Sequence, residues 1–270
     1  MKKLLTLIFI LTSTIVCGQT VYTQNPGLTL EQPRPLTIST NNFPYPVILG
    51  NGDDVWVGSS GWDGVQQSPP YTGTSKIERF NRKTGTLIAS ITNGPYYNNG
   101  QFHGVSGLAI AHGLVLGADR PGGEILVIDE NTNSIIKRTS VGLPRDVLAE
   151  PTGFWVSEVI GPSVVKLDTN GDVVSGSRIT FPSGSIPFRL RFKNGILYLT
   201  DAGLNRVWLI DVSNFTIITY FTAGIGPWGS DVNGTTLVVS NVGSPSFGAE
   251  IDLGNAVIEP GGLMTLRFGI

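Results

Sequence analysis

Residues 187–211 read P-F-R-L-R-F-K-N-G-I-L-Y-L-T-D-A-G-L-N-R-V-W-L-I-D, and this stretch decides the fold of the chain. It contains three short apolar strand signals; Asn194 and Gly195 separate the first two, and a turn with Gly203 separates the last two. Glycine, helped by asparagine, accepts the positive φ that a two-residue hairpin turn requires. The stretch therefore predicts three antiparallel strands that follow one another directly.

Weaker copies of this pattern recur before and after it, each with an inner strand, a turn, a second strand, a loop and a third strand. The five copies span 45–81, 105–129, 144–168, 187–211 and 227–268. Their third strands begin at Lys76, Glu124, Ser163, Arg206 and Leu263. A period near forty residues with three or four short strands per unit is typical of a β-propeller blade, and no sustained helical period competes with it. The sequence therefore predicts an all-β protein with the β-propeller fold.

The two ends of the repeat region predict how the ring closes. Outer fourth strands follow the first four copies, at 86–92, 134–140, 172–180 and 216–222. The fifth copy lacks one, whereas 35–40 (P-L-T-I-S-T) precedes the first inner strand without a repeat of its own. We expect 35–40 to pair with 262–268 and complete the last blade, because closure removes two unpaired edges. This predicts five blades, or six if 244–260 or 20–34 holds a degenerate blade.

The N-terminus has the pattern of a secretory signal. Lys2 and Lys3 precede an apolar run at 4–16, which is too short to span a bilayer. Cleavage after Gly18 would give a secreted or periplasmic protein, and the alternative is a lipid anchor on Cys17. The expected parts are a signal peptide, an N-terminal extension and one propeller domain: 1–18, 19–34 and 35–270.

Composition excludes several classes of function. The chain has 18 Lys and Arg against 20 Asp and Glu, a formal net charge of −2, and no basic run. It therefore lacks the electrostatic footprint of a nucleic-acid-binding protein. Its one cysteine lies in the signal region, so the mature protein has no disulfide. No later segment is long and apolar enough for a transmembrane helix, and we expect a monomer.

The segment L-Y-L-T-D-A-G-L-N-R-V-W-L-I-D (197–211) resembles the second half of the NHL repeat, typically V-Y-V-x-D-x-G-N-x-R-I-x-x-F-D. The other copies match more loosely and are equally similar to YVTN-type repeats. The resemblance covers most of the mature chain and implies the propeller fold. It does not imply a function, because propellers of this kind include enzymes, sugar-binding proteins and scaffolds.

Aromatic residues mark one face of the expected ring. The loops 59–75, 93–103 and 242–261 are expected on the same face, and 59–75 and 242–261 become neighbours when the ring closes. The expected ligand-binding residues on these loops are Trp62, Tyr71, Tyr96, Tyr97 and His103, with Phe102 beside them. Tyrosine and tryptophan offer an apolar body with a polar tip, suited to stacking on a sugar or peptide. The alternative is that these side chains pin the long loops onto the ring.

A column of residues ends the second strands and suggests a metal site. Its expected members are Ser59, Ala118, Glu158, Asp201 and Asn241, with Asp119 one place later. Oxygen ligands of Glu158, Asp201 and Asn241 could converge on calcium or another divalent cation. Gluconolactonase-type propellers, which this chain resembles distantly, hold a divalent metal with Glu, Asn and Asp, although their N-terminal Glu-Gly-Pro is absent here. The alternative is that the acids cap turns by accepting backbone hydrogen bonds.

Few residues could act as an acid or base. His103 alone lies on the expected loop-bearing face, since His112 falls in a hairpin turn on the other face. A distant resemblance to streptogramin-lyase-like propellers implies a histidine with a nearby glutamate and magnesium, but no motif here maps that set. The inner strands also carry residues that either bind an acidic ligand in the central channel or pair with one another: Arg145, Asp146, Arg189, Arg191 and Asp231.

These observations favour an exported β-propeller that acts as a binding or protein-interaction module through its loop-bearing face. The expected partner is a protein, a glycan or a small molecule. The rival hypothesis is a metal-dependent hydrolase or lyase with its site at the mouth of the central channel.

Overall fold

The structure is a computed structural model that describes residues 40, 44–60, 73–98, 101–233, 236–242, 253–259 and 262–268. The regular elements in this part of the chain are all β-strands, and no helix there could cross a membrane. The expected all-β class is confirmed. The expected signal peptide and N-terminal extension lie outside the described residues.

The described strands form five four-stranded antiparallel sheets, each built from strands consecutive in the chain. The first sheet contains β1 (Pro44–Leu49), β2 (Asp54–Ser59), β3 (Thr74–Asn81) and β4 (Leu87–Pro95), and the second contains β7 (Val105–Ala111), β8 (Leu114–Asp119), β9 (Glu124–Asp129) and β10 (Ser134–Ser140). The third contains β11 (Pro144–Glu150), β12 (Gly153–Glu158), β13 (Ser163–Leu167) and β14 (Ile179–Thr180). The fourth contains β15 (Pro187–Lys193), β16 (Ile196–Asp201), β17 (Arg206–Asp211) and β18 (Thr216–Thr222), and the fifth contains β19 (Pro227–Asn233), β20 (Thr236–Asn241), β21 (Leu253–Glu259) and β22 (Gly262–Phe268). Strands β5 (Tyr97–Asn98) and β6 (Gln101–Phe102) form a separate small hairpin between the first two sheets.

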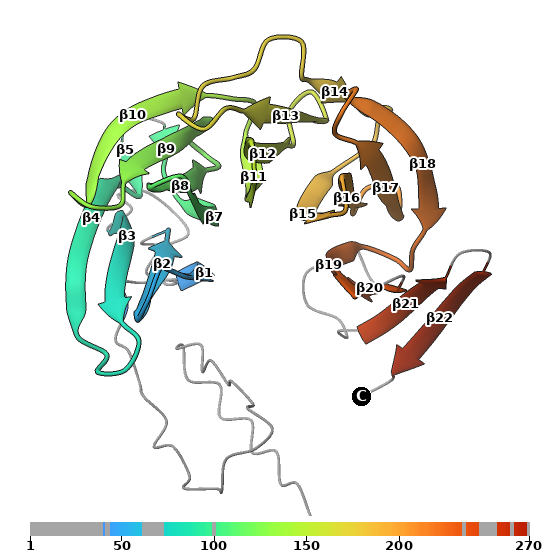
Figure 1. The fold of residues 1–270 in the computed structure, drawn as a ribbon, viewed down its shortest axis with the longest axis horizontal. Helices are drawn as coiled ribbons and strands as arrows, with labels where there is room; N and C mark the ends of the chain where they lie inside the picture. The colour runs from blue at the N-terminus through green and yellow to red at the C-terminus, as the bar shows by residue number, and fades with distance from the viewer. Residues whose placement is uncertain are drawn as a thin grey trace, which may run out of the picture.

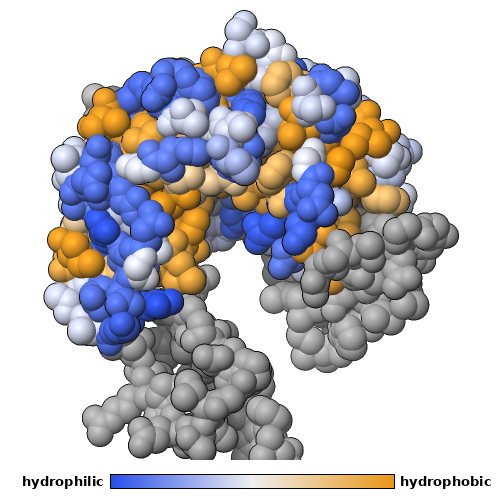
Figure 2. Space-filling view, in the orientation of Figure 1, coloured by the Kyte–Doolittle hydropathy of each residue, from blue (hydrophilic) through white to orange (hydrophobic). Residues whose placement is uncertain are grey.

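The five sheets stand in an arc around a central axis (Figure 1). Strands β1, β7, β11, β15 and β19 lie on the inside of the arc and contact one another in that order, while the later strands of each sheet lie toward the rim. A space-filling view shows the hollow that the inner strands surround (Figure 2). Radial repetition of short antiparallel sheets is the arrangement of a β-propeller.

The hydrophobic core lies between neighbouring sheets. Trp56 of the first sheet packs with Leu126 of the second, and Phe154 of the third packs with Leu116 of the second. Trp155 belongs to a further cluster shared by the third and fourth sheets. Each sheet therefore buries apolar side chains against its neighbours, which fixes the inner strands around the axis.

Local turn chemistry explains the hairpins. Asn194 and Gly195 have φ of 51° and 78°, the left-handed values of a two-residue type I′ turn. They join Lys193 to its partner Ile196, so the hairpin predicted for 187–211 is confirmed.

The fifth sheet differs from the expectation. Strand β22 (262–268) is its fourth strand and not its third, because β21 (253–259) lies between β20 and β22. The sequence of β21, L-G-N-A-V-I-E, has weak strand propensity at its glycine and asparagine. For this reason the sequence pattern placed the segment within the long loop 242–261. Residues 35–39 of the expected closing strand lie outside the described residues.

Candidate functional site

All five inner strands share one irregularity at their start. In every sheet, the first residue of the inner strand pairs with the last residue of the second strand, and the register shifts immediately afterwards. The second residue of each inner strand therefore has no partner in the ladder. Such β-bulges redirect side chains and are common next to functional sites. We call the face on which the inner strands begin the loop-bearing face.

The same pairing places one column of polar residues at the ends of the second strands: Ser59, Asp119, Glu158, Asp201 and Asn241. The expected register was wrong by one residue in the second sheet, where Asp119 occupies the column and Ala118 pairs with Gly107 instead. Six-residue strands β8 and β16 follow equivalent hairpin turns and end at Asp119 and Asp201. Counting from the turn would have given the correct register.

Asp201 is a buried turn cap. Its Oδ1 accepts hydrogen bonds from the backbone N–H groups of Ile186 (2.8 Å), Gly203 and Leu204 (both 3.1 Å). Its Oδ2 accepts one from Nε1 of Trp208 at 2.9 Å. A fully buried carboxylate requires such donors, and here they all come from the fourth sheet and its loops.

Glu158 is held in the same way within the third sheet. It accepts hydrogen bonds from the backbone N–H of Gly142 (2.8 Å) and from Oγ of Ser163 (2.6 Å), and it forms an ion pair with Arg178. In the fifth sheet, the amide of Asn241 fills the space beside Gly224, 2.8 Å from where a Cβ would lie. The hydrogen bonds of Glu158 and Asp201 are those of the turn-cap alternative.

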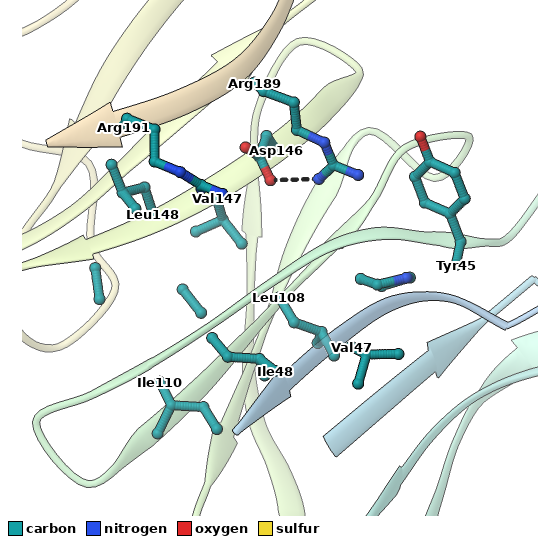
Figure 3. Close-up of a pocket in the computed structure, with 13 residues that line it drawn as sticks. Tyr45, Val47, Ile48, Leu108, Ile110, Asp146, Val147, Leu148, Arg189 and Arg191 are labelled. Carbon is teal, nitrogen blue, oxygen red and sulfur yellow. Dashed lines mark hydrogen bonds and ion pairs between the residues drawn. The ribbon is translucent and has the colours of Figure 1, made fainter. Parts of the chain in front are cut away.

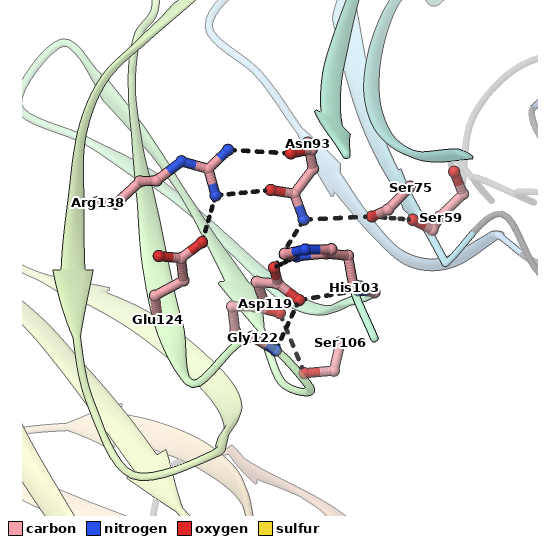
Figure 4. Close-up of polar contacts among 11 residues, drawn as sticks. Ser59, Ser75, Asn93, His103, Ser106, Asp119, Gly122, Glu124 and Arg138 are labelled. Atoms are coloured by element: carbon pink, nitrogen blue, oxygen red, sulfur yellow. Dashed lines mark hydrogen bonds and ion pairs between the residues drawn. The ribbon is translucent and has the colours of Figure 1, made fainter. Parts of the chain in front are cut away.

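A different set of residues comes together between the first two sheets. Nδ1 of His103 lies 2.7 Å from Oδ2 of Asp119 (Figure 4). Asp119 is fully buried and also accepts hydrogen bonds from Nδ2 of Asn93 (2.8 Å) and the backbone N–H of Gly104 (2.8 Å). These contacts fix the imidazole ring, whose Nε2 has no hydrogen-bond partner among the described residues.

Glu124 extends this network at its edge. Its carboxylate pairs with Arg138, which also donates to Oδ1 and the backbone oxygen of Asn93, both at 3.0 Å (Figure 4). Within the described part of the chain, His103, Asp119 and Glu124 are the one group of three His, Cys, Asp or Glu residues close enough to share a metal ion.

Four side chains from four sheets meet at the start of the inner strands, and we call them the mouth cluster: Tyr45, Arg145, Phe188 and Trp228. Each is the second, unpaired residue of its inner strand and follows a proline. Proline is tolerated there because the inner strand is an edge of its sheet. Sequence reasoning missed the aromatic members, although the repeated proline followed by an aromatic residue or arginine was a readable signal.

Aromatic rings surround the guanidinium of Arg145. Its Cζ lies 4.1 Å from the ring centroid of Phe188, 5.6 Å from that of Trp228 and 5.7 Å from that of Tyr45. The rings of Phe188 and Trp228 are themselves 4.2 Å apart. Cation–π contact of this kind holds an arginine in place without neutralising its charge. Burial lowers the pKa of Arg145 to about 10, and the neighbouring Arg120 and Arg189 act in the same direction.

Below the mouth cluster, Asp146 joins the third and fourth sheets. Its Oδ1 lies 2.9 Å from Nη1 of Arg189 (Figure 3). Its Oδ2 accepts a hydrogen bond from the backbone N–H of Leu190 at 3.0 Å. Although burial opposes it, the Asp146 carboxylate raises the pKa of Arg189. The sequence left two alternatives for these residues, binding an acidic ligand or pairing with one another. Asp146 and Arg189 pair with one another.

A cavity of about 600 Å³ occupies the axis between β1, β7, β11 and β15. Tyr45, Asp146, Arg189 and Arg191 supply polar groups, and the remaining lining is mainly aliphatic, as in Ile48 and Leu108 (Figure 3). The volume is within the range of small-molecule sites, and polar groups from three inner strands converge on it.

The structure places only part of the expected aromatic site. Tyr96 and His103 lie beside the loop-bearing face, and the backbone N–H of His103 donates a hydrogen bond to the backbone carbonyl oxygen of Tyr96 at 2.9 Å. Trp62 and Tyr71 lie outside the described residues, as do the side chains of Tyr97 and Phe102.

No protein-family model matches the sequence, and no curated protein sequence matches it either. Solved structures do. The hydrazine synthase of Kuenenia stuttgartiensis is 14% identical, with a TM-score of 0.64 over 90% of this chain and 70% of that chain. The Cps50 (Swd1) β-propeller domain of Myceliophteria thermophila is 14% identical, with a TM-score of 0.61 over 86% and 73%. A putative 6-phosphogluconolactonase of Bacteroides uniformis is 15% identical, with a TM-score of 0.60 over 86% and 73%. At such identities the similarity shows the β-propeller fold, which confirms that expectation, and it shows no particular function.

Proposed function

We propose that this chain is a binding module and that the mouth of its central channel is the ligand site. One observation carries the proposal. The bulge at the start of the inner strands turns Tyr45, Arg145, Phe188 and Trp228, from four different sheets, toward one another above a cavity of about 600 Å³. None of the four side chains belongs to the hydrophobic clusters between the described sheets.

The aromatic members differ in how much surface they leave for a ligand. Phe188 is buried and supports the cluster from below, whereas Tyr45 and Trp228 are half-buried. Half-buried tyrosine and tryptophan side chains can stack on a sugar ring or a peptide group and still hydrogen-bond. The proposed working face also includes Trp62, Tyr71 and Tyr97, which are expected from the sequence on loops of the same face.

The proposal includes the setting of the module. The signal pattern at 1–18 supports export to the periplasm or the outside of the cell, with lipidation at Cys17 as the alternative. The match of 197–211 to the NHL pattern supports repeats of that type. We take the five sheets as five blades, and we keep the pairing of 35–40 with 262–268 as the proposed closure of the ring.

Binding is tested by screening the mature protein against immobilised glycans and peptides and then comparing two variants. Trp228→Ala removes the half-buried ring at the mouth, and Tyr220→Ala removes a ring that is 44% exposed on outer strand β18. We expect Trp228→Ala to weaken capture at least tenfold and Tyr220→Ala to leave it unchanged. Equal capture by both variants, with thermal midpoints showing both folded, would exclude the mouth as the site.

A second candidate function is a hydrolase or lyase that uses His103 as its base. The 2.7 Å contact with buried Asp119 favours a proton on Nδ1 and leaves Nε2 as the acceptor. A divalent cation bound by the carboxylates of Asp119 and Glu124 would displace the Arg138 ion pair, and His103 would then act as the base and not as a metal ligand. The test is turnover of sugar lactones, aryl esters and uronate-containing glycans with calcium, magnesium or zinc. Turnover that is lost in His103→Gln supports the enzyme; none with any of these metals rules it out for these substrates.

A further inference from the structure

We propose that Arg145 is the anchor for an oxyanion group, a carboxylate or a phosphate, on the ligand that the channel mouth binds. This inference rests on the proposed function and specifies the chemistry of the ligand. It starts from the charged groups that the described residues bring to the mouth, where Arg120, Arg189 and Asp146 lie close to Arg145.

Arg120 and Arg189 both lie close enough to Arg145 to lower its pKa. The carboxylate among them is Asp146, and its two oxygens are engaged by Arg189 and by the backbone of Leu190. Arg145 forms no ion pair with any carboxylate of the described residues. Among the described residues, Arg145 is therefore a partly buried positive charge that no carboxylate pairs with directly, although Asp146 lies close enough to raise its pKa. Burying an uncompensated charge is costly, and an anionic ligand would remove that cost.

The geometry of Arg145 also favours an oxyanion. A guanidinium has five N–H donors, and one of them has a partner in the described part of the chain, the Tyr45 hydroxyl at 3.5 Å from Nη2. The ring centroid of Phe188 at 4.1 Å covers the group and fixes its position. An arginine held in this way is pre-organised to present its planar fork to a carboxylate or phosphate.

The surroundings indicate what the oxyanion is attached to. Tyr45 contacts both Arg145 and Arg189, at 5.7 Å and 5.2 Å from its ring centroid, and it also lines the cavity. A ligand with its oxyanion on Arg145 can therefore place an apolar or sugar-like body against Tyr45 and Trp228. The predicted class is a small organic acid or phosphate monoester, including acidic sugars.

The experiment is calorimetric titration of the mature protein with inorganic phosphate, citrate and galacturonate at constant ionic strength, with chloride as the balancing salt. Arg145→Gln keeps a polar side chain of similar length without the charge. Arg206→Gln is the matched control, because Arg206 also lies over aromatic rings, 4.0 Å from Tyr220, but on β17 away from the mouth. We expect Arg145→Gln to weaken binding at least tenfold and Arg206→Gln to leave it unchanged. Arg145→Lys should fall between the wild type and Arg145→Gln, because lysine keeps the charge and loses the fork.

The outcomes separate this inference from the proposed function. Absence of binding by all three anions, or equal loss in Arg145→Gln and Arg206→Gln, overturns the oxyanion site. Capture of a neutral glycan that depends on Trp228 but not on Arg145 leaves the binding module intact and contradicts this inference alone. Anion binding that depends on Arg145, together with ligand capture that ignores Trp228→Ala, contradicts the proposed function alone. Tighter binding of inorganic phosphate than of galacturonate indicates a phosphate ligand, and the reverse order indicates a carboxylate ligand.

Discussion

Asp146 pairs with Arg189 of the neighbouring sheet, at 2.9 Å between Oδ1 and Nη1, and not with Arg145, the residue that precedes it in the chain. The pair joins β11 to β15 close to the axis. Asp146 therefore forms its ion pair with Arg189, and Arg145 forms none with the described carboxylates. The contact links the third and fourth sheets and leaves the guanidinium of Arg145 available to a ligand.

Loss of this ion pair should destabilise the protein. Asp146 is 5% exposed, and breaking a buried pair leaves an uncompensated charge, so Asp146→Asn should lower the free energy of unfolding by about 3 kcal/mol. Urea denaturation measures the change. The control is Asp231→Asn. The Asp231 side chain is 84% exposed and its Oδ1 lies 3.7 Å from Nε of Arg191, so the control should change the free energy of unfolding by less than about 0.5 kcal/mol. Equal losses in the two variants would contradict a stabilising role for the Asp146–Arg189 pair.

Acid sensitivity should depend on Glu150. Burial raises the pKa of Glu150, but hydrogen bonds from Lys166 and Thr152 and the positive charge of Lys166 outweigh it. The pKa of Glu150 is therefore below its ordinary value of 4.5. Because the folded-state pKa is depressed, the stabilisation is fully present above pH 4.5 and is lost as the pH falls through the lower folded-state pKa. Glu150→Gln should therefore be less stable than the wild type at neutral pH and lose less stability on acidification. Parallel stability curves from neutral to acidic pH would contradict this assignment.

The turn cap at Asp201 should contribute strongly to the stability of the fold. Asp201→Ala removes the acceptor for three backbone N–H groups and for Nε1 of Trp208. Leaving buried donors unsatisfied should lower the free energy of unfolding by about 2 to 4 kcal/mol, measured by thermal and urea unfolding. Asp168→Ala, which removes a cap on a more exposed turn, should cost less than half as much. A loss no larger than that of Asp168→Ala would contradict the buried cap.

Calcium should not stabilise the protein through Glu158, Asp201 and Asn241. The carboxylates of Glu158 and Asp201 already accept hydrogen bonds within their own sheets. We expect the thermal midpoint to be unchanged in millimolar calcium. A rise that disappears in Asn241→Ala would return the metal hypothesis to these three residues.

The repeat made the fold predictable, but the β-bulges and strand β21 were not evident from the sequence. Asn194 and Gly195 predict a hairpin because few other residues accept positive φ. The fifth sheet was misread because glycine and asparagine interrupt β21, and strand pairing depends on neighbours that local propensity does not reveal.

The candidate site was harder to predict than the fold. His103 was identified by its place on the loop-bearing face. Its partner Asp119 was expected one residue beyond the end of the second strand, whereas the register makes Asp119 itself the last residue of that strand. Arg145 was identified as a channel residue, whereas the rings around it were not. Their convergence depends on bulges in different sheets; the proline that begins each of these inner strands was a signal, but hydrophobic alternation alone does not reveal the additional residue.

The most direct test of the binding proposal is hydrogen–deuterium exchange with and without a ligand captured in the screen. The account predicts slower exchange at the starts of β1, β11, β15 and β19, where the mouth cluster lies, and no change in outer strands β10 and β18. Protection confined to the outer strands, with unchanged exchange at 44–49, 144–150 and 227–233, would contradict it.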